Sequence, residues 1–147
     1  MKTFILIFIF FLQNAITQDN YKFTIMGNNL KNSNIKLPDK SVFNMFESKG
    51  AFTDNKGNIG DFEGQGVRKT NNKGVLINVN ALIVFKIDNK SSMWAFPTRV
   101  ESDLEVGAGY FDVFFASGSL KELLGKRCQY GLTVTKQNSF VMQGFCK

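Results

Sequence analysis

The segment VLINVNALIVFKI, at Val75–Ile87, restricts the fold more than any other part of the sequence. Its odd-numbered positions are all apolar, and its even-numbered positions include Asn78, Asn80 and Lys86. This period of two, together with the many β-branched residues, predicts a strand with one buried face rather than a helix. A strand this long favours a barrel or a strongly coiled sheet over a small flat sheet.

Other apolar or alternating runs follow along the chain, separated by turn residues such as those of Asp54–Gly57 and Asn71–Gly74. Short connections of this kind are typical of antiparallel hairpins. The sequence therefore predicts an all-β fold: a single antiparallel, mostly up-and-down barrel of about eight strands. Besides Val75–Ile87, the predicted strands are Tyr21–Met26, Val42–Thr53, Ile59–Thr70, Met93–Val100, Gly109–Ala116, Arg127–Thr135 and Phe140–Cys146.

The two cysteines lie in the last two predicted strands. If these strands form a hairpin that turns at Gln137, Cys128 lies opposite Cys146, and the same register buries apolar or small residues on one face. Directly opposed residues have about the Cα separation that a disulfide needs. We therefore expect a Cys128–Cys146 disulfide, and closing its loop of 19 residues should stabilise the fold by about 3 kcal/mol. The other pairs on this face are Tyr130–Gly144, Leu132–Met142 and Val134–Phe140.

One short helix is predicted near 119–125, just before the first cysteine. Ser119 and Glu122 have the spacing of a capping box, and Gly125 stands where a helix ends. Three leucines would form its apolar face. Because so short a helix is unstable alone in water, we expect it to pack on the open end of the barrel, as a connecting turn or as a lid over a ligand pocket. The leucines are Leu120, Leu123 and Leu124.

The N-terminus has the pattern of a secretory signal peptide. Lys2 precedes the apolar run Phe4–Leu12, and Ala15–Thr17 supplies small residues before a cleavage site. The run is too short for a transmembrane segment, which takes about 20 apolar residues. We expect a signal peptide over 1–17, a single domain over 18–147, and a secreted, extracellular protein in which a disulfide persists. The sequon at Asn89 makes that residue a candidate for N-glycosylation.

The formal net charge of the chain is +6, but its positive residues are scattered, with acidic residues between them. Nucleic-acid binding by a basic patch is therefore not expected. A weak attraction to anionic surfaces, either glycans or membranes, is compatible with this charge. The sequence does not determine the oligomeric state.

The chain contains no histidine, which removes the usual nucleophile–histidine pairs and imidazole metal sites. With both cysteines expected in a disulfide, we predict no metal site, no cofactor and no catalytic residue. Carboxylates that alternate along a strand are the remaining candidates for acid–base chemistry, although a solvated face with local ion pairs is the simpler explanation of them. They are Asp61, Glu63, Glu101, Asp103 and Glu105.

Aromatic residues make up 14% of the sequence and fall mainly in the predicted strands. They are expected either to fill the core or to line a cavity for a small apolar ligand, because barrels of about eight strands can hold one small molecule. The candidate ligand-lining residues are Phe85, Trp94, Phe111, Phe115 and Tyr130.

A diffuse set of residues resembles the barrels of the allene oxide cyclase/dirigent-like superfamily over 50–147. The set comprises Phe52–Asp54, Gly57, Asn58, Gly60, Lys73–Val75, Trp94, Arg99, Ser102, Asp103, Gly107–Gly109, Gly118 and Leu124–Lys126 before Cys128. The resemblance implies a barrel whose interior accepts apolar small molecules, which a few such proteins guide through isomerisation or coupling. No catalytic residue of these barrels matches a position here, so the resemblance carries no activity over.

Two functions are compatible with these features. The first is a secreted, non-enzymatic barrel that binds a small apolar ligand or acts as an extracellular effector of the salivary or venom type. The second is a barrel isomerase or cyclase that uses carboxylate and aromatic side chains on an apolar substrate. The first predicts a void inside the barrel, and the second predicts a buried carboxylate beside an aromatic pocket.

Overall fold

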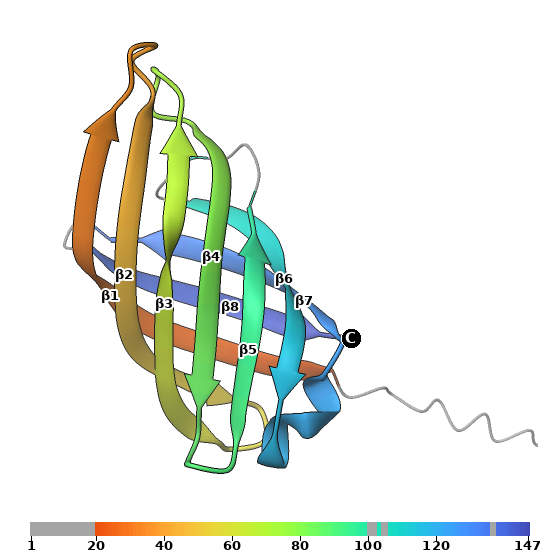
Figure 1. Ribbon diagram of the computed structural model, residues 1–147. Coiled ribbons are helices and arrows are strands. Elements are labelled where there is room, and N and C mark those ends of the chain that lie inside the picture. Colours follow the sequence, from red (N-terminus) through yellow and green to blue (C-terminus); the bar gives the residue numbers. More distant parts are fainter. Residues whose placement is uncertain (1–19, 100–102, 104–105, 136–137) are drawn as a thin grey trace, which may run out of the picture.

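The computed structural model describes residues 20–99, 103, 106–135 and 138–147. These residues confirm the all-β prediction, because eight antiparallel strands form a closed barrel in which β8 returns to pair with β1 (Figure 1). In Figure 1, β7, β8 and the start of β1 cross behind β2–β5. The strands are β1 (Tyr21–Lys36), β2 (Val42–Asp54), β3 (Ile59–Thr70), β4 (Leu76–Lys86), β5 (Ser92–Thr98), β6 (Val106–Ala116), β7 (Arg127–Val134) and β8 (Ser139–Cys146).

The first strand is much longer than its apolar pattern predicted. The predicted Tyr21–Met26 is only the start of β1, which continues through a register irregularity near Leu30 to Lys36. Up to Asn28 the strand pairs with both β2 and β8, whereas beyond the irregularity it pairs with β2 alone. Asn and Lys residues, which are poor strand formers, are therefore held extended by pairing with β2. This end of β1–β4 rises beyond the rest of the barrel (Figure 1).

In β4, the strand predicted from Val75–Ile87, the alternation of inward and outward side chains is interrupted near the start. Thr70 lies opposite Leu76, but Lys69 lies opposite Asn78, so Ile77 is the extra residue of a bulge. Leu76 is buried, and Ile77 is 40% exposed. The prediction that all the odd-numbered side chains of this segment face the interior is therefore wrong at Ile77, near the start of the strand. It holds for the buried odd positions beyond the bulge, which are Ala81, Ile83 and Phe85.

Aromatic rings fill the half of the barrel that lies near η1 (Gly118–Leu123), a 3₁₀ helix. Phe85 is central, with its ring centroid 5.3 Å from that of Phe52, 5.5 Å from Phe62 and 5.9 Å from Phe111. Edge-on and tilted contacts at such distances are favourable for aromatic pairs. This half of the interior is therefore a packed core.

The short helix packs against β5 and β6 and closes this end of the barrel (Figure 1). Leu120 and Leu123 are fully buried, as predicted, but Leu124 is 52% exposed. The predicted capping box is wrong, because η1 begins after Ser117 with no side-chain cap, and Glu122 forms an ion pair with Lys56 instead. A helix of six residues is too short to be stabilised by its own caps alone. Contacts with the barrel position it.

Hydrogen bonds to the β4–β5 turn and the start of β5 hold the residues at the beginning of η1. The Ser117 hydroxyl donates to the Lys90 carbonyl (2.9 Å) and accepts from the Ser92 backbone N–H (3.1 Å). The Ser119 backbone N–H in turn donates to the Ser91 hydroxyl (3.3 Å). Serine side chains of the barrel and of the preceding loop thus take over the role that was predicted for the capping box.

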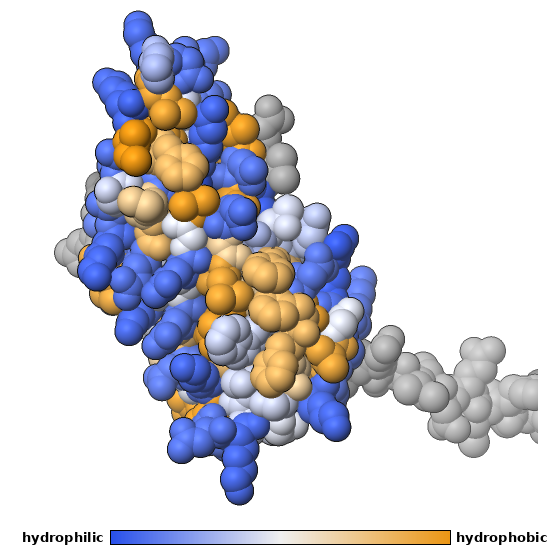
Figure 2. Space-filling model, in the orientation of Figure 1, coloured by the Kyte–Doolittle hydropathy of each residue, from blue (hydrophilic) through white to orange (hydrophobic). Residues whose placement is uncertain are grey.

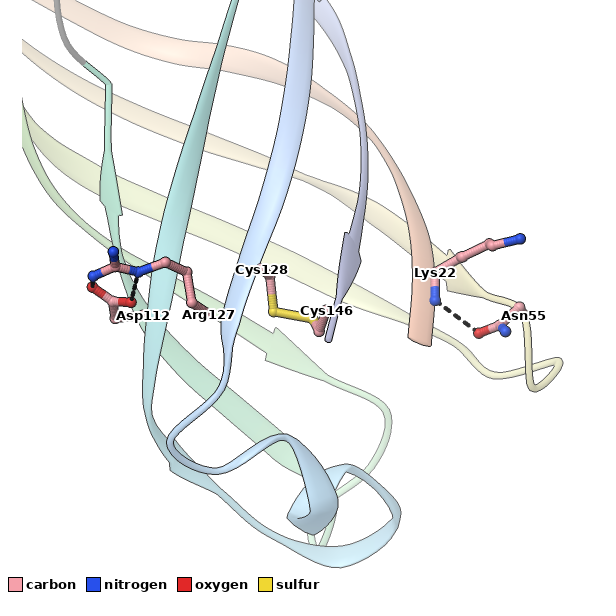
Figure 3. The surroundings of a disulfide bond; sticks show 6 residues. All are labelled: Lys22, Asn55, Asp112, Arg127, Cys128 and Cys146. Carbon is pink, nitrogen blue, oxygen red and sulfur yellow. Dashed lines mark hydrogen bonds and ion pairs between the residues drawn. A yellow bond between two sulfur atoms is a disulfide. The ribbon is translucent and has the colours of Figure 1, made fainter. Parts of the chain in front are cut away.

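The β7–β8 hairpin has the predicted register, and Cys128 lies opposite Cys146. The two sulfur atoms form a disulfide that is buried at the end of the barrel (Figure 3). Polar contacts flank it on both sides (Figure 3). On one side Arg127 and Asp112 form a bidentate ion pair (2.6 and 2.9 Å). On the other side the Lys22 backbone N–H donates to the side-chain oxygen of Asn55 (2.9 Å). The predicted turn at Gln137 lies outside the described residues.

Candidate functional site

A cavity of about 90 Å³ lies in the barrel interior, on the side away from η1, and it is partly open to solvent. Phe62, Ile83 and Phe140 of the hydrophobic core border it. Its wall is mainly apolar, with contributions from both sides of the barrel. These include Leu76, Val79 and Ala81 from β4, Leu132 and Val134 from β7, and Met142 from β8.

Polar groups also converge on the cavity. Its lining includes two arginines, Arg68 and Arg99, together with Tyr130, Ser48 and Asn29. A mainly apolar cavity with a few converging polar groups is the usual form of a small-molecule site. The two guanidinium groups give one part of this lining a positive charge.

Arg68 projects from β3 and is held by neutral partners. Its Nε donates to Oδ1 of Asn44 (2.7 Å), directly opposite on β2, and a terminal nitrogen lies 3.4 Å from Oδ1 of Asn32. Its guanidinium carbon lies 5.5 Å from the centroid of Phe46. Asn44 is itself buried and donates to Asn34 (2.6 Å). Burial, and then the nearby charge of Arg99, lower the pKa of Arg68.

Arg99 directly follows β5 and is 6% exposed. Its guanidinium donates to the backbone carbonyl of Asp103. A Cβ on Gly107 would lie 2.4 Å from a terminal nitrogen of Arg99. The guanidinium therefore fits here because residue 107 has no side chain. Burial lowers the pKa of Arg99, and the nearby Tyr130 and Asp103 oppose that shift.

Tyr130, on β7, contributes a neutral hydroxyl. Burial raises the pKa of Tyr130 to about 12, although the charge of Arg99 acts in the opposite direction. Its ring stacks on Phe111, with centroids 6.1 Å apart. The phenol therefore stays protonated at neutral pH and is available as a hydrogen-bond donor.

The five predicted ligand-lining residues do not meet in one cavity. Tyr130 lines it, whereas Phe85 and Phe111 are fully buried in the packed aromatic half. Trp94 alternates with the buried Met93 and Ala95, so its side chain lies on the outer face. Phe115 is also outside, 47% exposed.

A bulge explains the position of Phe115. Trp94 lies opposite Phe115 and Ala95 opposite Val113, which leaves Phe114 as the extra residue. Both phenylalanines are therefore exposed, and Phe114 stacks on Phe96 with centroids 4.4 Å apart. Figure 2 shows apolar residues gathered on this outer face, over β4–β6.

Sequence reasoning missed the two arginines of the cavity, although a signal for them was present. Phe62, Gly64 and Arg68 share one parity on β3, and Met93, Ala95 and Arg99 share one parity on β5 and just beyond it. The apolar members of each set face the interior. If the same alternation is continued for a few more residues along each strand, both arginines also face the interior. Their charge argued against that position.

The carboxylates that were candidates for acid–base chemistry do not line the cavity. Asp61 and Asp103 are exposed, and Glu63 is paired with Lys49 at 3.6 Å on the outer face. Glu101 and Glu105 lie outside the described residues. Among the residues that the structure describes, no group of three or more acidic or cysteine side chains is arranged to hold a metal ion.

Asn89, the candidate glycosylation site, is exposed in the β4–β5 turn, where a glycan would not meet the barrel wall. No helix in the described parts of the chain has the length and apolarity of a membrane span.

No protein-family model matches the chain, and the searches of curated proteins and of solved structures also gave no match. The resemblance to allene oxide cyclase/dirigent-like barrels therefore stays a prediction.

Proposed function

We propose that this protein is a non-enzymatic binding protein that takes a small apolar ligand into the cavity of its barrel. The observation that carries the proposal is the mainly apolar cavity of about 90 Å³ in the barrel interior, which is partly open to solvent. Apolar walls gain free energy when they exchange water for apolar atoms.

The cavity volume limits the size of the ligand. A void of this size has room for several waters, and an apolar cavity of about 150 Å³ can hold benzene. The cavity is smaller than that, so the matching ligand is a short aliphatic chain, and the partly open side leaves space for an end that protrudes. A larger ligand would require side chains to move.

Secretion is part of the proposal. The N-terminal pattern over 1–17 and the buried Cys128–Cys146 disulfide support it, because disulfides persist mainly outside the cytosol. N-terminal sequencing of the protein recovered from expressing cells tests it. A chain that begins at Gln18 in the medium is expected, and a chain retained in the cell with Met1 intact would contradict it. An effector role in saliva or venom, and weak binding to anionic surfaces, stay predictions.

Titration of the folded, isotope-labelled protein with hexanol, followed by methyl NMR, tests ligand binding. We expect saturable shifts at Leu132, Val134 and Met142, which line the cavity. Val134→Phe should fill the space and abolish the shifts at Leu132 and Met142. Val141→Phe is the matched control, because Val141 lies on the same hairpin but is 39% exposed. Absence of shifts in the wild-type protein, or equal loss in both variants, would overturn the proposal.

The isomerase or cyclase alternative needs a buried carboxylate beside the cavity. Asp61, Glu63 and Asp103 are not among the residues that line the cavity, and no observation favours this alternative over binding.

A further inference from the structure

The cavity has a charged part that a purely apolar ligand does not explain. Building on the proposed function, we propose that the natural ligand is a small amphipathic carboxylate, with its apolar body against the β4 and β7 walls and its carboxylate on Arg68, close to Arg99.

The first argument is the charge around the cavity. Arg68 and Arg99 both line it, and the charge of Arg99 acts on Arg68. Within the described residues, Arg68 forms no ion pair, and its hydrogen-bond partners are the amide oxygens of Asn44 and Asn32. Two like charges in a partly desolvated space repel each other. An anion bound on Arg68 would offset that repulsion.

The second argument is the orientation of Arg68. Asn44 accepts from Nε at 2.7 Å, and Asn44 is itself fixed by its bond to Asn34. Phe46 lies under the guanidinium plane. These contacts hold the guanidinium in place and leave terminal N–H groups for another acceptor. A planar guanidinium fork matches the two oxygens of a carboxylate.

The third argument is the chemistry of the remaining lining. Tyr130 contributes a protonated hydroxyl, which can donate to an anionic oxygen. Leu132 and Val134 of β7, and Val79 of β4, form an apolar wall in the same cavity. Val79 lies directly opposite Arg68 in the register, so a charged group and an apolar wall are adjacent. An amphipathic anion satisfies both.

The experiment compares hexanoate with hexanol, which have the same chain length and differ in the charge of the head group. Both are titrated into the folded protein, and binding is followed by the methyl shifts of Leu132 and Val134 and by the Nε–H resonance of Arg68. We expect hexanoate to bind about tenfold or more tightly than hexanol, since a hydrogen bond to a charged group contributes about that factor.

Arg68→Leu should lower the affinity for hexanoate about tenfold or more and change that for hexanol less than about threefold. Arg68→Lys keeps the charge without the planar fork and should give an intermediate loss. The control is Arg127→Leu, which removes one positive charge from the outer face, where Arg127 pairs with Asp112. It should leave both affinities unchanged.

The outcomes separate the two proposals. If neither compound binds, the proposed function is wrong. If hexanol binds and hexanoate binds no better, or if Arg68→Leu affects both equally, ligand binding stands and the carboxylate inference is wrong. If Arg68→Leu does not fold, the wild-type protein decides: a hexanoate-specific shift of the Arg68 Nε–H supports the inference, and its absence refutes it.

Discussion

The ring of Phe23 on β1 lies over Gly144, its direct cross-strand partner on β8, and a Cβ built on Gly144 would lie 2.4 Å from the ring. Three further aromatic residues cover cross-strand glycines in the same way, so aromatic rings take up the space that the glycines leave empty. Glycines inside strands often mark bends of the sheet. Their close approach to rings is a second reason for their positions. The other pairs are Phe52–Gly60, Phe140–Gly27 and Tyr130–Gly109.

Gly144→Ala should destabilise the fold by about 2–3 kcal/mol, because the new methyl would also lie 2.3 Å from the backbone oxygen of Gln129, which cannot move aside without distorting the sheet. The measurement is the free energy of unfolding in urea. Gly131→Ala on the neighbouring strand is the control, since a Cβ there meets nothing within 4 Å. It should be neutral or stabilise by up to about 1 kcal/mol. Equal effects of the two substitutions would refute the close-approach account.

Replacing both cysteines by alanine should lower the free energy of unfolding by about 3 kcal/mol or more, because Cys128 and Cys146 close a loop across a sequence separation of 18 and are both buried. Urea unfolding of the double variant, compared with the wild type with and without reductant, checks this. Reduction alone should have a similar but smaller effect, since it leaves the buried sulfur atoms in place. No loss of stability in either case would show that this end of the barrel closes without the bond.

Phe85→Ala should cost about 3–5 kcal/mol, because Phe85 is fully buried among Phe52, Phe62 and Phe111. Phe115→Ala is the matched control: the same atoms are removed from a ring that is 47% exposed, and we expect a loss below about 1 kcal/mol. Thermal or urea unfolding of both variants distinguishes them. A cost at Phe115 similar to that at Phe85 would mean that the outer aromatic residues are buried in an assembly.

The free energy of unfolding should decrease at acidic pH, because aspartates in the hairpin turns become protonated. Burial alone would raise the pKa of Asp54, but hydrogen bonds from Asn58 outweigh it and lower the pKa. Backbone N–H groups of Lys90 and Ser91 lower the pKa of Asp88. A carboxyl group whose pKa is lower in the folded than in the unfolded state stabilises the fold at pH values above the unfolded-state pKa, which is near 4. This stabilisation is lost as the pH falls through the folded-state pKa.

Because the chain contains no histidine, the free energy of unfolding should be nearly constant from about pH 5 to 8 and should decrease below about pH 4. Urea unfolding across this range tests the profile. In Asp54→Asn the acid-dependent decrease should be smaller than in the wild type. A decrease centred near pH 6.5 would contradict the assignment to aspartates.

At alkaline pH the folded protein should lose stability as Tyr130 ionises, because burial disfavours the charged phenolate. Its pKa is raised to about 12, above the ordinary value near 10, so its contribution to stability is present below pH 10 and is lost as pH rises toward 12. Ultraviolet titration of the phenolate in the wild type and in Tyr130→Phe checks this. If the substitution removes a transition near pH 10 rather than a later one, the hydroxyl is not buried as described.

Much of the architecture was predictable from the sequence because local signals agree with it. Alternation over Val75–Ile87, turn residues between the runs and the pairing of Cys128 with Cys146 each restrict the chain to antiparallel strands. The register of the last hairpin was predictable because one register both buries the apolar residues and joins the sulfur atoms. The second half of β1 was missed, because Asn and Lys residues adopt a strand there only through pairing with β2.

The candidate site was less predictable, since it depends on which residues share the interior once the barrel has closed. By itself the sequence determined an all-β chain, the cysteine pair and a leucine-bearing turn near one end. Only the tertiary structure decided that the bulge at Phe114 turns aromatic residues outward, that Phe85 and Phe111 fill one half of the interior, and that Arg68 reaches the cavity in the other. The physical reason is that strand alternation assigns faces locally, whereas bulges and closure decide which faces meet.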